Sequence, residues 1–247
     1  MLSNFHIVAF THRNIAVSEI GLLHIESDNQ QERLTFLKNE LGLTELMFLS
    51  TCNRVEFVFC TDVNVDVTFL DYFFQTLYPE FSHEQAATFA EKGEWMHGKN
   101  AVEHLLSVAS SIDSMVIGER EIITQVRNAF EESKRMNLTG DFIRLVIRHT
   151  IETAKKVYTN TSIATKPVSV VSLAYHKLRD LDIPLDARIL IIGAGVTNTN
   201  MSRFLKKHGF KKFVVFNRTL SKAEALAKDL NGRAFSLSQL GNYNEGY

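Results

Sequence analysis

Residues 48–59 read FLSTCNRVEFVF, and this stretch decides how the first part of the chain folds. Two apolar runs typical of β-strands lie on either side of a polar Ser-Thr-Cys-Asn-Arg segment. The pattern predicts a strand, a turn and a second strand. Because the end of a strand can hold a side chain rigidly and still leave it accessible, Cys52 lies where a nucleophile is useful.

The two residues after Cys52 are Asn53 and Arg54. The guanidinium of Arg54 can favour the reactive thiolate of Cys52 or bind a substrate carboxylate through two parallel hydrogen bonds. The competing interpretation is that Cys52 is a small buried apolar residue, as free cysteines commonly are. Cys60 fits that interpretation better, because it ends an apolar run and has no charged residue beside it.

Composition is typical of a globular protein. The chain has 247 residues, of which 45% are apolar, enough for one large or two ordinary domains. Its two cysteines indicate neither a disulfide framework nor a zinc site, so we expect a reducing, cytoplasmic environment and no metal. We find no export signal and no membrane span. The net charge of −1 gives no general attraction to nucleic acid.

Up to residue 158 the patterns predict a domain of mixed helices and strands. We expect a strand over 5–10, a polar turn over 11–14, and helices over 29–41, 65–78, 100–108 and 141–159. In the third of these helical segments, His104 shares the apolar face and should point inward. A core histidine is the commoner interpretation, although a near-neutral pKa makes His104 the acid-base candidate.

A polar break follows at residues 113–118, and another helix is predicted to start at Glu119. Ser114, Glu119, Glu121 and Gln125 should cluster around the beginning of this helix. Helix capping and a solvated face explain such a cluster without any function. The basic side chains of the helix over 141–159 form either a solvated face or a phosphate-binding face; they are Arg144, Arg148, Lys155 and Lys156.

Residues 159–168 are polar and form the predicted linker, with the domain boundary near 158. Residues 188–195 (RILIIGAG) then predict a buried strand that leads into a glycine turn, a helix over 196–207 and a second strand over 212–216. This order is typical of a Rossmann-type dinucleotide-binding domain, in which pyrophosphate approaches backbone amides at the helix start. The predicted turn residues are Gly193, Ala194, Gly195, Val196, Thr197 and Asn198.

The second strand ends in Asn217, Arg218 and Thr219. An acidic residue at this place would hold the ribose 2′-hydroxyl of NAD, whereas Arg218 and Thr219 offer positive charge and a hydroxyl to a 2′-phosphate. We therefore expect NADP(H) rather than NAD. The fold class is α/β, with an α+β N-terminal domain over 1–158 and a truncated Rossmann-type domain over 159–247.

Several blocks of the chain resemble the glutamyl-tRNA reductase family. They are the THRN turn, the STCNR segment, the block HLLSVASSIDSMVIGEREIITQVRNAF, and GAG followed by NRT. The resemblance implies that Cys52 is the nucleophile, that Arg54 helps to hold substrate glutamate, and that His104 matches an activity-sensitive histidine. It implies further substrate contacts at Thr51, Asn53, Ser114, Glu119, Arg120, Glu121 and Gln125, and an NADP loop at 193–198.

The chain departs from the family pattern at three positions. The family usually has Pro and Gln at the places of Arg120 and Glu121, and glycine at the place of Asn198. Glu121 would repel a substrate carboxylate. The family also has a C-terminal dimerisation domain, which we expect to be absent, so the homodimer of the full-length family is not expected to form in the same way.

The resemblance implies reduction of glutamyl-tRNA(Glu) to glutamate-1-semialdehyde, the first step of 5-aminolevulinate and tetrapyrrole biosynthesis. The Cys52 thiolate would attack the ester to form a thioester, which NADPH would reduce. The downstream glutamate-1-semialdehyde aminomutase is a candidate partner. Two alternatives stay open: a shikimate-dehydrogenase-like NADP oxidoreductase, which does not need Cys52, and a catalytically silent module that binds tRNA or another partner.

Overall fold

The computed structural model describes residues 2–114, 117–164 and 170–243. The chain divides into two compact units, Met1–Pro167 and Val168–Tyr247. The boundary predicted near residue 158 falls within helix α7 (Asp141–Asn160), and the first unit continues beyond it through η3 (Ser162–Ala164). Residues 165–168 of the predicted linker lie outside the described residues.

The first unit is built on a four-stranded antiparallel sheet with the strand order β2-β3-β1-β4. The strands are β1 (Phe5–Thr11), β2 (Glu45–Ser50), β3 (Arg54–Cys60) and β4 (Glu94–His97). Every residue of β1 and of β3 is buried. Both strands are therefore covered on both faces, which explains their nearly continuous apolar sequence.

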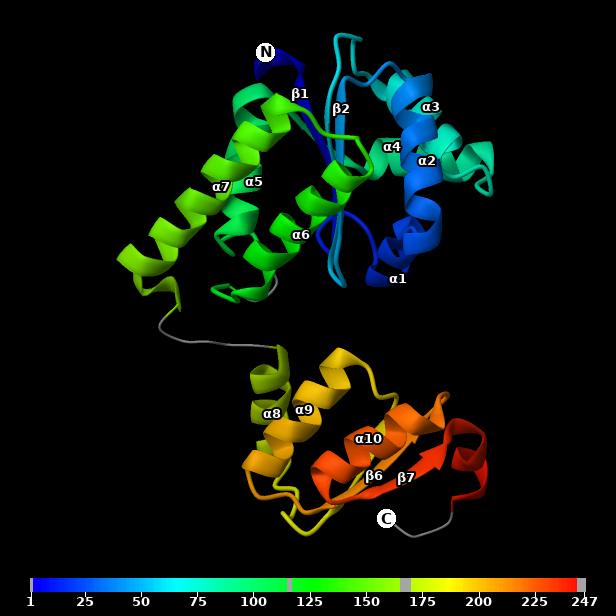
Figure 1. The fold of residues 1–247 in the computed structure, drawn as a ribbon, viewed down its shortest axis with the longest axis vertical. Helices are drawn as coiled ribbons and strands as arrows, with labels where there is room; N and C mark the ends of the chain where they lie inside the picture. Colours follow the sequence, from blue (N-terminus) through cyan, green and yellow to red (C-terminus); the bar gives the residue numbers. More distant parts are fainter. Residues whose placement is uncertain (1, 115–116, 165–169, 244–247) are drawn as a thin grey trace. The chain divides into compact units, whose positions relative to one another are not determined.

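Helices cover the two faces of this sheet (Figure 1). On one face lie α1 (Val17–Ile20), α2 (Ser27–Glu40), α3 (Val67–Leu77) and α4 (His83–Lys92), around a core rich in phenylalanine. On the other lie α5 (Gly98–Ala109), α6 (Glu121–Arg135) and α7. Because side chains alternate along a strand, neighbouring residues of β3 belong to different cores.

Acidic side chains outside the helices bind the amides at the N-termini of α3 and α7. Asp66 accepts a hydrogen bond from the Phe69 amide at the start of α3, at 2.9 Å. The start of α7 is capped from another element: the carboxylate of Glu45, on β2, accepts from the amides of Gly140 at 2.7 Å and Ile143 at 2.9 Å. A negative charge at the N-terminus of a helix also interacts favourably with the positive end of the helix dipole. Glu45 therefore stabilises the start of α7 and links this helix to β2.

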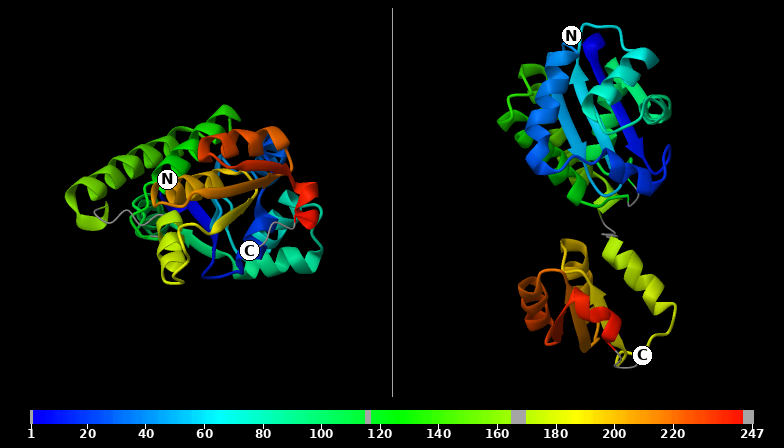
Figure 2. Two further views of the ribbon diagram at one scale, coloured as in Figure 1. Left: turned by 90° about the horizontal axis from the view of Figure 1, so that it is seen from below. Right: turned by 90° about the vertical axis from the view of Figure 1, so that its right-hand side faces the viewer.

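The second unit contains a three-stranded parallel sheet with the order β5-β6-β7 (Figure 2). Its strands are β5 (Arg188–Ile192), β6 (Lys212–Asn217) and β7 (Arg233–Ser236), and its helices are α8 (Val170–Arg179), α9 (Val196–Lys207) and α10 (Leu220–Leu230). Parallel strands need crossovers, which α9 and α10 supply. The predicted strand, glycine turn, helix and strand are all present, and the predicted α/β fold class is confirmed.

Within the described residues, no helix has the length and apolar character needed to cross a membrane.

The loop between α5 and α6 packs against the end of α7. Gly118 has a φ of +86°, and its amide donates to the backbone oxygen of Ser111 at 3.2 Å and to the Ser111 hydroxyl at 3.0 Å. A Cβ atom at Gly118 would lie 2.2 Å from the backbone oxygen of Ile163. Nearby, the Tyr158 hydroxyl donates to the backbone oxygen of Glu119 at 2.9 Å. Only glycine fits at this point.

We predict that Gly118→Ala lowers the free energy of unfolding by about 1–3 kcal/mol through backbone strain alone, and by more because the added Cβ collides with a carbonyl oxygen. Gly21→Ala is the matched control. Gly21 has a φ of −61° and has no atom within 4 Å of its added Cβ, so this change should cost nearly nothing. Urea denaturation of the two variants measures the difference, and equal stability would contradict the proposed packing.

Candidate functional site

Cys52 lies at the tip of the hairpin that joins β2 to β3. The turn has two residues, Cys52 and Asn53, and is closed by a hydrogen bond from the Thr51 amide to the Arg54 backbone oxygen at 2.9 Å. The Thr51 hydroxyl accepts from the amides of Asn53 and Arg54, each at 3.2 Å. Thr51 therefore holds the turn itself. Cys52 is exposed, which rules out the interpretation of Cys52 as a buried apolar residue, whereas Cys60 is buried, as its apolar run predicts.

A surface pocket of about 410 Å³ opens beside Cys52. Its walls are Val17, Ile20, Gly21, His24, Ser50, Thr51 and Cys52. The Nδ1 atom of His24 lies 2.9 Å from the Ser50 hydroxyl. The sequence analysis assigns no role to His24 or Ser50, because no periodic pattern places the residues after α1 next to the end of β2.

The environment of Cys52 favours the thiol over the thiolate. Although Cys52 is exposed, burial is the largest cause that raises its pKa, and the charges of Glu119 and Glu121 raise it further; a hydrogen bond from its own backbone lowers it. The structure thus brings Cys52 near two of the predicted substrate contacts. Arg54 is not among the groups that shift the Cys52 pKa, and its guanidinium contacts Glu56 and Asp113 instead, so a role of Arg54 in favouring the thiolate has no support in this structure.

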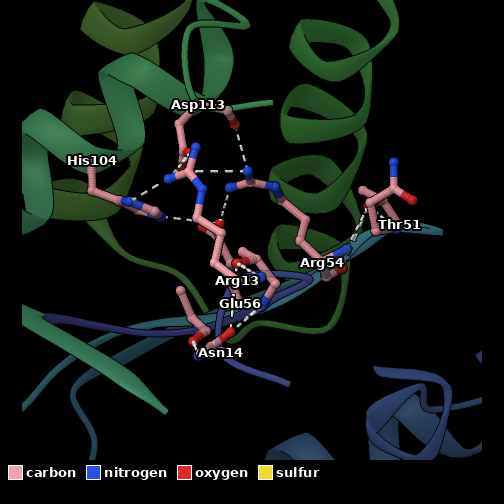
Figure 3. Close-up of polar contacts among 10 residues, drawn as sticks. Arg13, Asn14, Thr51, Arg54, Glu56, His104 and Asp113 are labelled. Atoms are coloured by element: carbon pink, nitrogen blue, oxygen red, sulfur yellow. Dashed lines mark hydrogen bonds and ion pairs between the residues drawn. The ribbon is translucent and has the colours of Figure 1, made fainter. Parts of the chain in front are cut away.

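Arg54 points away from the tip and into the face that carries α5. Arg54 and Glu56 are two residues apart on β3, so their side chains lie on the same face. One terminal nitrogen of Arg54, Nη1, donates to Glu56 Oε1. The other, Nη2, donates to the backbone oxygen of Asp113 and lies 3.5 Å from its Oδ2 atom (Figure 3). The Arg54 side chain is only 7% exposed.

His104 joins the same cluster from α5. As predicted, it points inward, and its side chain is 9% exposed. Its Nε2 atom lies 3.0 Å from Glu56 Oε1, and its Nδ1 atom lies 3.7 Å from Asp113 Oδ2 (Figure 3). Neither Glu56 nor Asp113 is named among the sequence candidates, because the contacts of Glu56 with His104 and of Asp113 with Arg54 join residues that are far apart along the chain.

The polar turn after β1 places a second arginine at the rim of the cluster. Asn14 fixes this turn by accepting from the Thr11 amide at 2.7 Å and donating to the backbone oxygens of Ala9 and Lys92, each at 2.9 Å. Arg13 then reaches Asp113, with Nη1 and Oδ1 at 2.6 Å. Unlike Arg54, the Arg13 side chain is 58% exposed.

The charges of the cluster stabilise one another. Burial alone would raise the pKa of Glu56, but the charges and hydrogen bonds of His104 and Arg54 outweigh it, and the pKa of Glu56 is lowered. For His104, burial lowers the pKa, and the positive charge of Arg54 lowers it further. The charge and hydrogen bond of Glu56 and the charge of Asp113 raise the pKa by more than this. The pKa of His104 is therefore raised.

The other predicted substrate contacts lie at and just before the start of α6. Ser114 and Glu119 are half-buried in the preceding loop, and Gln125 is half-buried on the helix. Arg120 and Glu121 are exposed. The helix begins at Glu121 rather than at the predicted Glu119.

The glycine turn that the sequence predicts after β5 is present. Gly193 has a φ of +96°, and its amide donates to the backbone oxygen of Phe216 at 2.7 Å. The side chain of Asn198 donates from Nδ2 to the backbone oxygens of Ile192 and Gly193, each at 2.9 Å. Asn198 therefore ties the turn to the first turn of α9, which explains how the chain does without a glycine there.

The end of β6 supports this turn. Asn217 accepts from the Ala194 amide at 3.0 Å and donates to the Thr219 backbone oxygen at 2.8 Å. A Cβ atom at Gly195 would meet nothing within 4 Å, so space is open at the start of α9, where Val196 and Thr197 form the first turn. Arg218 and Thr219 are exposed. These features fit a bound dinucleotide phosphate.

In the part of the chain that the structure describes, no group of three or more His, Cys, Asp or Glu side chains is placed to hold a metal ion.

Comparison with known proteins identifies the family. Residues 8–161 match the family model "Glutamyl-tRNAGlu reductase, N-terminal domain", and residues 172–246 match "Shikimate / quinate 5-dehydrogenase". The chain is 32% identical over 238 residues to glutamyl-tRNA reductase of Marinobacter nauticus, covering 94% of this chain and 53% of that protein. It is 31% identical over 253 residues to that of Saccharolobus solfataricus, covering 100% of this chain and 56% of that protein.

The structure of glutamyl-tRNA reductase from Methanopyrus kandleri matches with a TM-score of 0.59 at 26% identity, over 96% of this chain and 55% of that one. The chain thus spans about half the length of the relatives that it matches. The matched family model covers the hairpin with Cys52 and the buried cluster around Arg54 and His104. The chain belongs to the glutamyl-tRNA reductase family.

Proposed function

We propose that this chain carries the catalytic and cofactor-binding parts of an NADPH-dependent reductase that converts glutamyl-tRNA to glutamate-1-semialdehyde. The observation that carries the proposal is the exposed thiol of Cys52, held at the tip of a two-residue turn beside a pocket of about 410 Å³. Membership of the family supports the same reaction, which opens the route to 5-aminolevulinate and tetrapyrroles.

In the proposed reaction, the Cys52 sulfur attacks the carbonyl carbon of the glutamyl ester. A C–S bond forms, the C–O bond to the terminal ribose breaks, and the tRNA leaves with a proton on its ribose oxygen. When bound, NADPH supplies the hydride that turns the thioester into an aldehyde and frees the sulfur. Because the pKa of Cys52 is raised, the thiolate fraction and hence the rate of attack should increase as the pH rises toward that pKa.

The second unit would hold the cofactor. The open space at Gly195 and the amides at the start of α9 suit a pyrophosphate. Among the described residues Arg218 has no ion-pair partner, and it is exposed at the end of β6, where the sequence predicts the 2′-phosphate. Glutamyl-tRNA itself would be bound through local groups, among which are the exposed Arg148, Lys155 and Lys156 of α7.

Two observations are compatible with a different class of function. The raised pKa of Cys52 and the engagement of Arg54 by Glu56 and Asp113 would also suit a module that binds tRNA without chemistry. The two proposals differ in whether a glutamyl group becomes attached to Cys52. A shikimate-dehydrogenase-like activity would account for residues 172–246 but would leave the match over 8–161 without a role.

Cys52→Ser should abolish both the glutamyl adduct and the reduction of glutamyl-tRNA, since loss of a nucleophile commonly costs several orders of magnitude in rate. Cys60→Ser is the control, because Cys60 is buried and its pKa is raised to about 12, mainly by burial. The adduct is measured by mass spectrometry after incubation with glutamyl-tRNA in the absence of NADPH. An adduct that persists in Cys52→Ser, or none in the parent chain, would contradict the proposal.

Arg218→Ala should weaken NADPH binding by about 1.5–3 kcal/mol, the scale of a hydrogen bond to a charged group, and leave NADH binding nearly unchanged. Lys211→Ala, an exposed cation just before β6, is the matched control and should affect neither cofactor. Fluorescence titration with both cofactors measures the four affinities. If NADPH and NADH weaken equally, Arg218 has a structural role only.

A further inference from the structure

His104 is the member of the buried cluster whose charge state the geometry decides. An imidazole has two ring nitrogens, and in the neutral form one of them carries a proton while the other presents a lone pair. In this structure both nitrogens face carboxylates: Nε2 lies 3.0 Å from Glu56 Oε1, and Nδ1 lies 3.7 Å from Asp113 Oδ2. The first distance is that of a hydrogen bond, and the second is that of an ion pair if the ring carries a positive charge.

A neutral ring does not suit this position. With the proton on Nε2, the lone pair of Nδ1 would face the negative Asp113; with the proton on Nδ1, the lone pair of Nε2 would face the negative Glu56. Either tautomer places negative density against a carboxylate in a site with little water. The doubly protonated ring meets both carboxylates with N–H groups.

Glu56 gives an independent reason. Its side chain is fully buried, and such a carboxylate is costly unless cations compensate it. Arg54 and His104 converge on the same oxygen, Oε1, while Oε2 has no hydrogen-bond partner within the described residues. With His104 neutral, Arg54 alone would balance a carboxylate that is already incompletely bonded.

We propose that Glu56 and Asp113 hold His104 as a doubly protonated imidazolium, so that His104 is a fixed positive charge in the site and not the base that removes a proton from Cys52. Glu56 is then a positioning residue, which acts through the ring of His104 and through Arg54. The charge state of His104 is a property of the chain without substrate. Only its consequence for the reaction rests on the function proposed above.

All charged groups around the ring enter this balance. Glu56 on β3 and Asp113 in the loop after α5 favour the proton, whereas Arg54 on β3 disfavours it. Arg13, from the turn after β1, binds Asp113 from its exposed side at 2.6 Å and shares its charge. The two carboxylates prevail over burial and Arg54, consistent with the raised pKa of His104.

The consequence for the proposed reaction is that the proton of Cys52 leaves by another path. A ring whose two nitrogens both carry protons has no acceptor to offer. His104 instead contributes positive charge to the site and keeps Glu56 and Asp113 in place. Replacing His104 would therefore disturb the position of Arg54 as well as the local charge.

The test is an NMR titration of the chain with isotope-labelled histidine, in which the His104 signals are assigned by their loss in His104→Gln. At neutral pH we expect protons on both ring nitrogens of His104. In Glu56→Gln the proton affinity of this ring should fall about tenfold or more, because the change removes the nearest opposite charge. Glu103→Gln is the matched control. Glu103 lies on α5, next to His104 in the sequence, but its side chain is 58% exposed and paired with Lys99.

A His104 ring that is neutral at pH 7 in the parent chain would overturn the proposal, whether or not the chain proves to be a reductase. An unchanged titration in Glu56→Gln would do the same. Should Glu56→Gln not fold, the state of the ring in the parent chain and its response to Asp113→Asn decide the question. Adduct formation at Cys52 is measured separately, so failure of the function and failure of this inference are distinguishable.

Stability provides a second readout with a definite sign. The pKa of His104 is raised on folding, so its contribution is fully present below the unfolded value of about 6.5 and is lost as the pH rises through the folded value. The urea midpoint of the parent chain should therefore fall from neutral to alkaline pH. Glu56→Gln should show a smaller fall, while Glu103→Gln should follow the parent. Equal slopes in all three chains would overturn the proposal.

Discussion

The first unit depends on the buried pair of Arg54 and Glu56 on β3. A guanidinium and a carboxylate with little access to water need compensating partners, and His104 of α5 and Asp113 of the following loop supply part of this compensation. The pair thus connects the middle of the sheet to a helix and a loop. Asp113 in turn holds Arg13, so the turn after β1 belongs to the same bonded group.

Part of this arrangement can be predicted from the sequence. Alternation along β3 places Arg54 and Glu56 on one face, and helical spacing places His104 on the inner face of α5. That these faces meet cannot be predicted from local patterns, because Glu56 and His104 are 48 residues apart, and Arg54 and Asp113 are 59 residues apart. The sequence therefore identifies Cys52 and Arg54 but not the direction in which Arg54 points. The predicted roles of the site residues stay predictions.

The same distinction explains which elements are predictable. The strand Phe5–Thr11 and the helices Ser27–Glu40 and Val67–Leu77 follow regular apolar spacing, and their predicted ranges agree to within a few residues. The strand Glu94–His97 has four residues, most of them exposed, at the edge of the sheet. Its strand conformation comes from pairing with β1 rather than from an apolar pattern, so the local sequence does not predict this strand. At Asn198, a substitution that breaks the family pattern is explained only by its two hydrogen bonds to the turn.

The position of β1 inside the sheet has a consequence for the order in which a nascent chain can fold. β1 is made first, yet its neighbours are β3, which ends at Cys60, and β4, which ends at His97. While the ribosome is still adding residues before 94, one edge of β1 has no strand to pair with, and its backbone groups are open to wrong partners. The first unit can close its sheet only after residue 97 has left the exit tunnel, and the cluster around Glu56 can form only after Asp113 has followed. During synthesis, β1, which is fully buried in the finished unit, therefore waits for its second neighbour until β4 has been made.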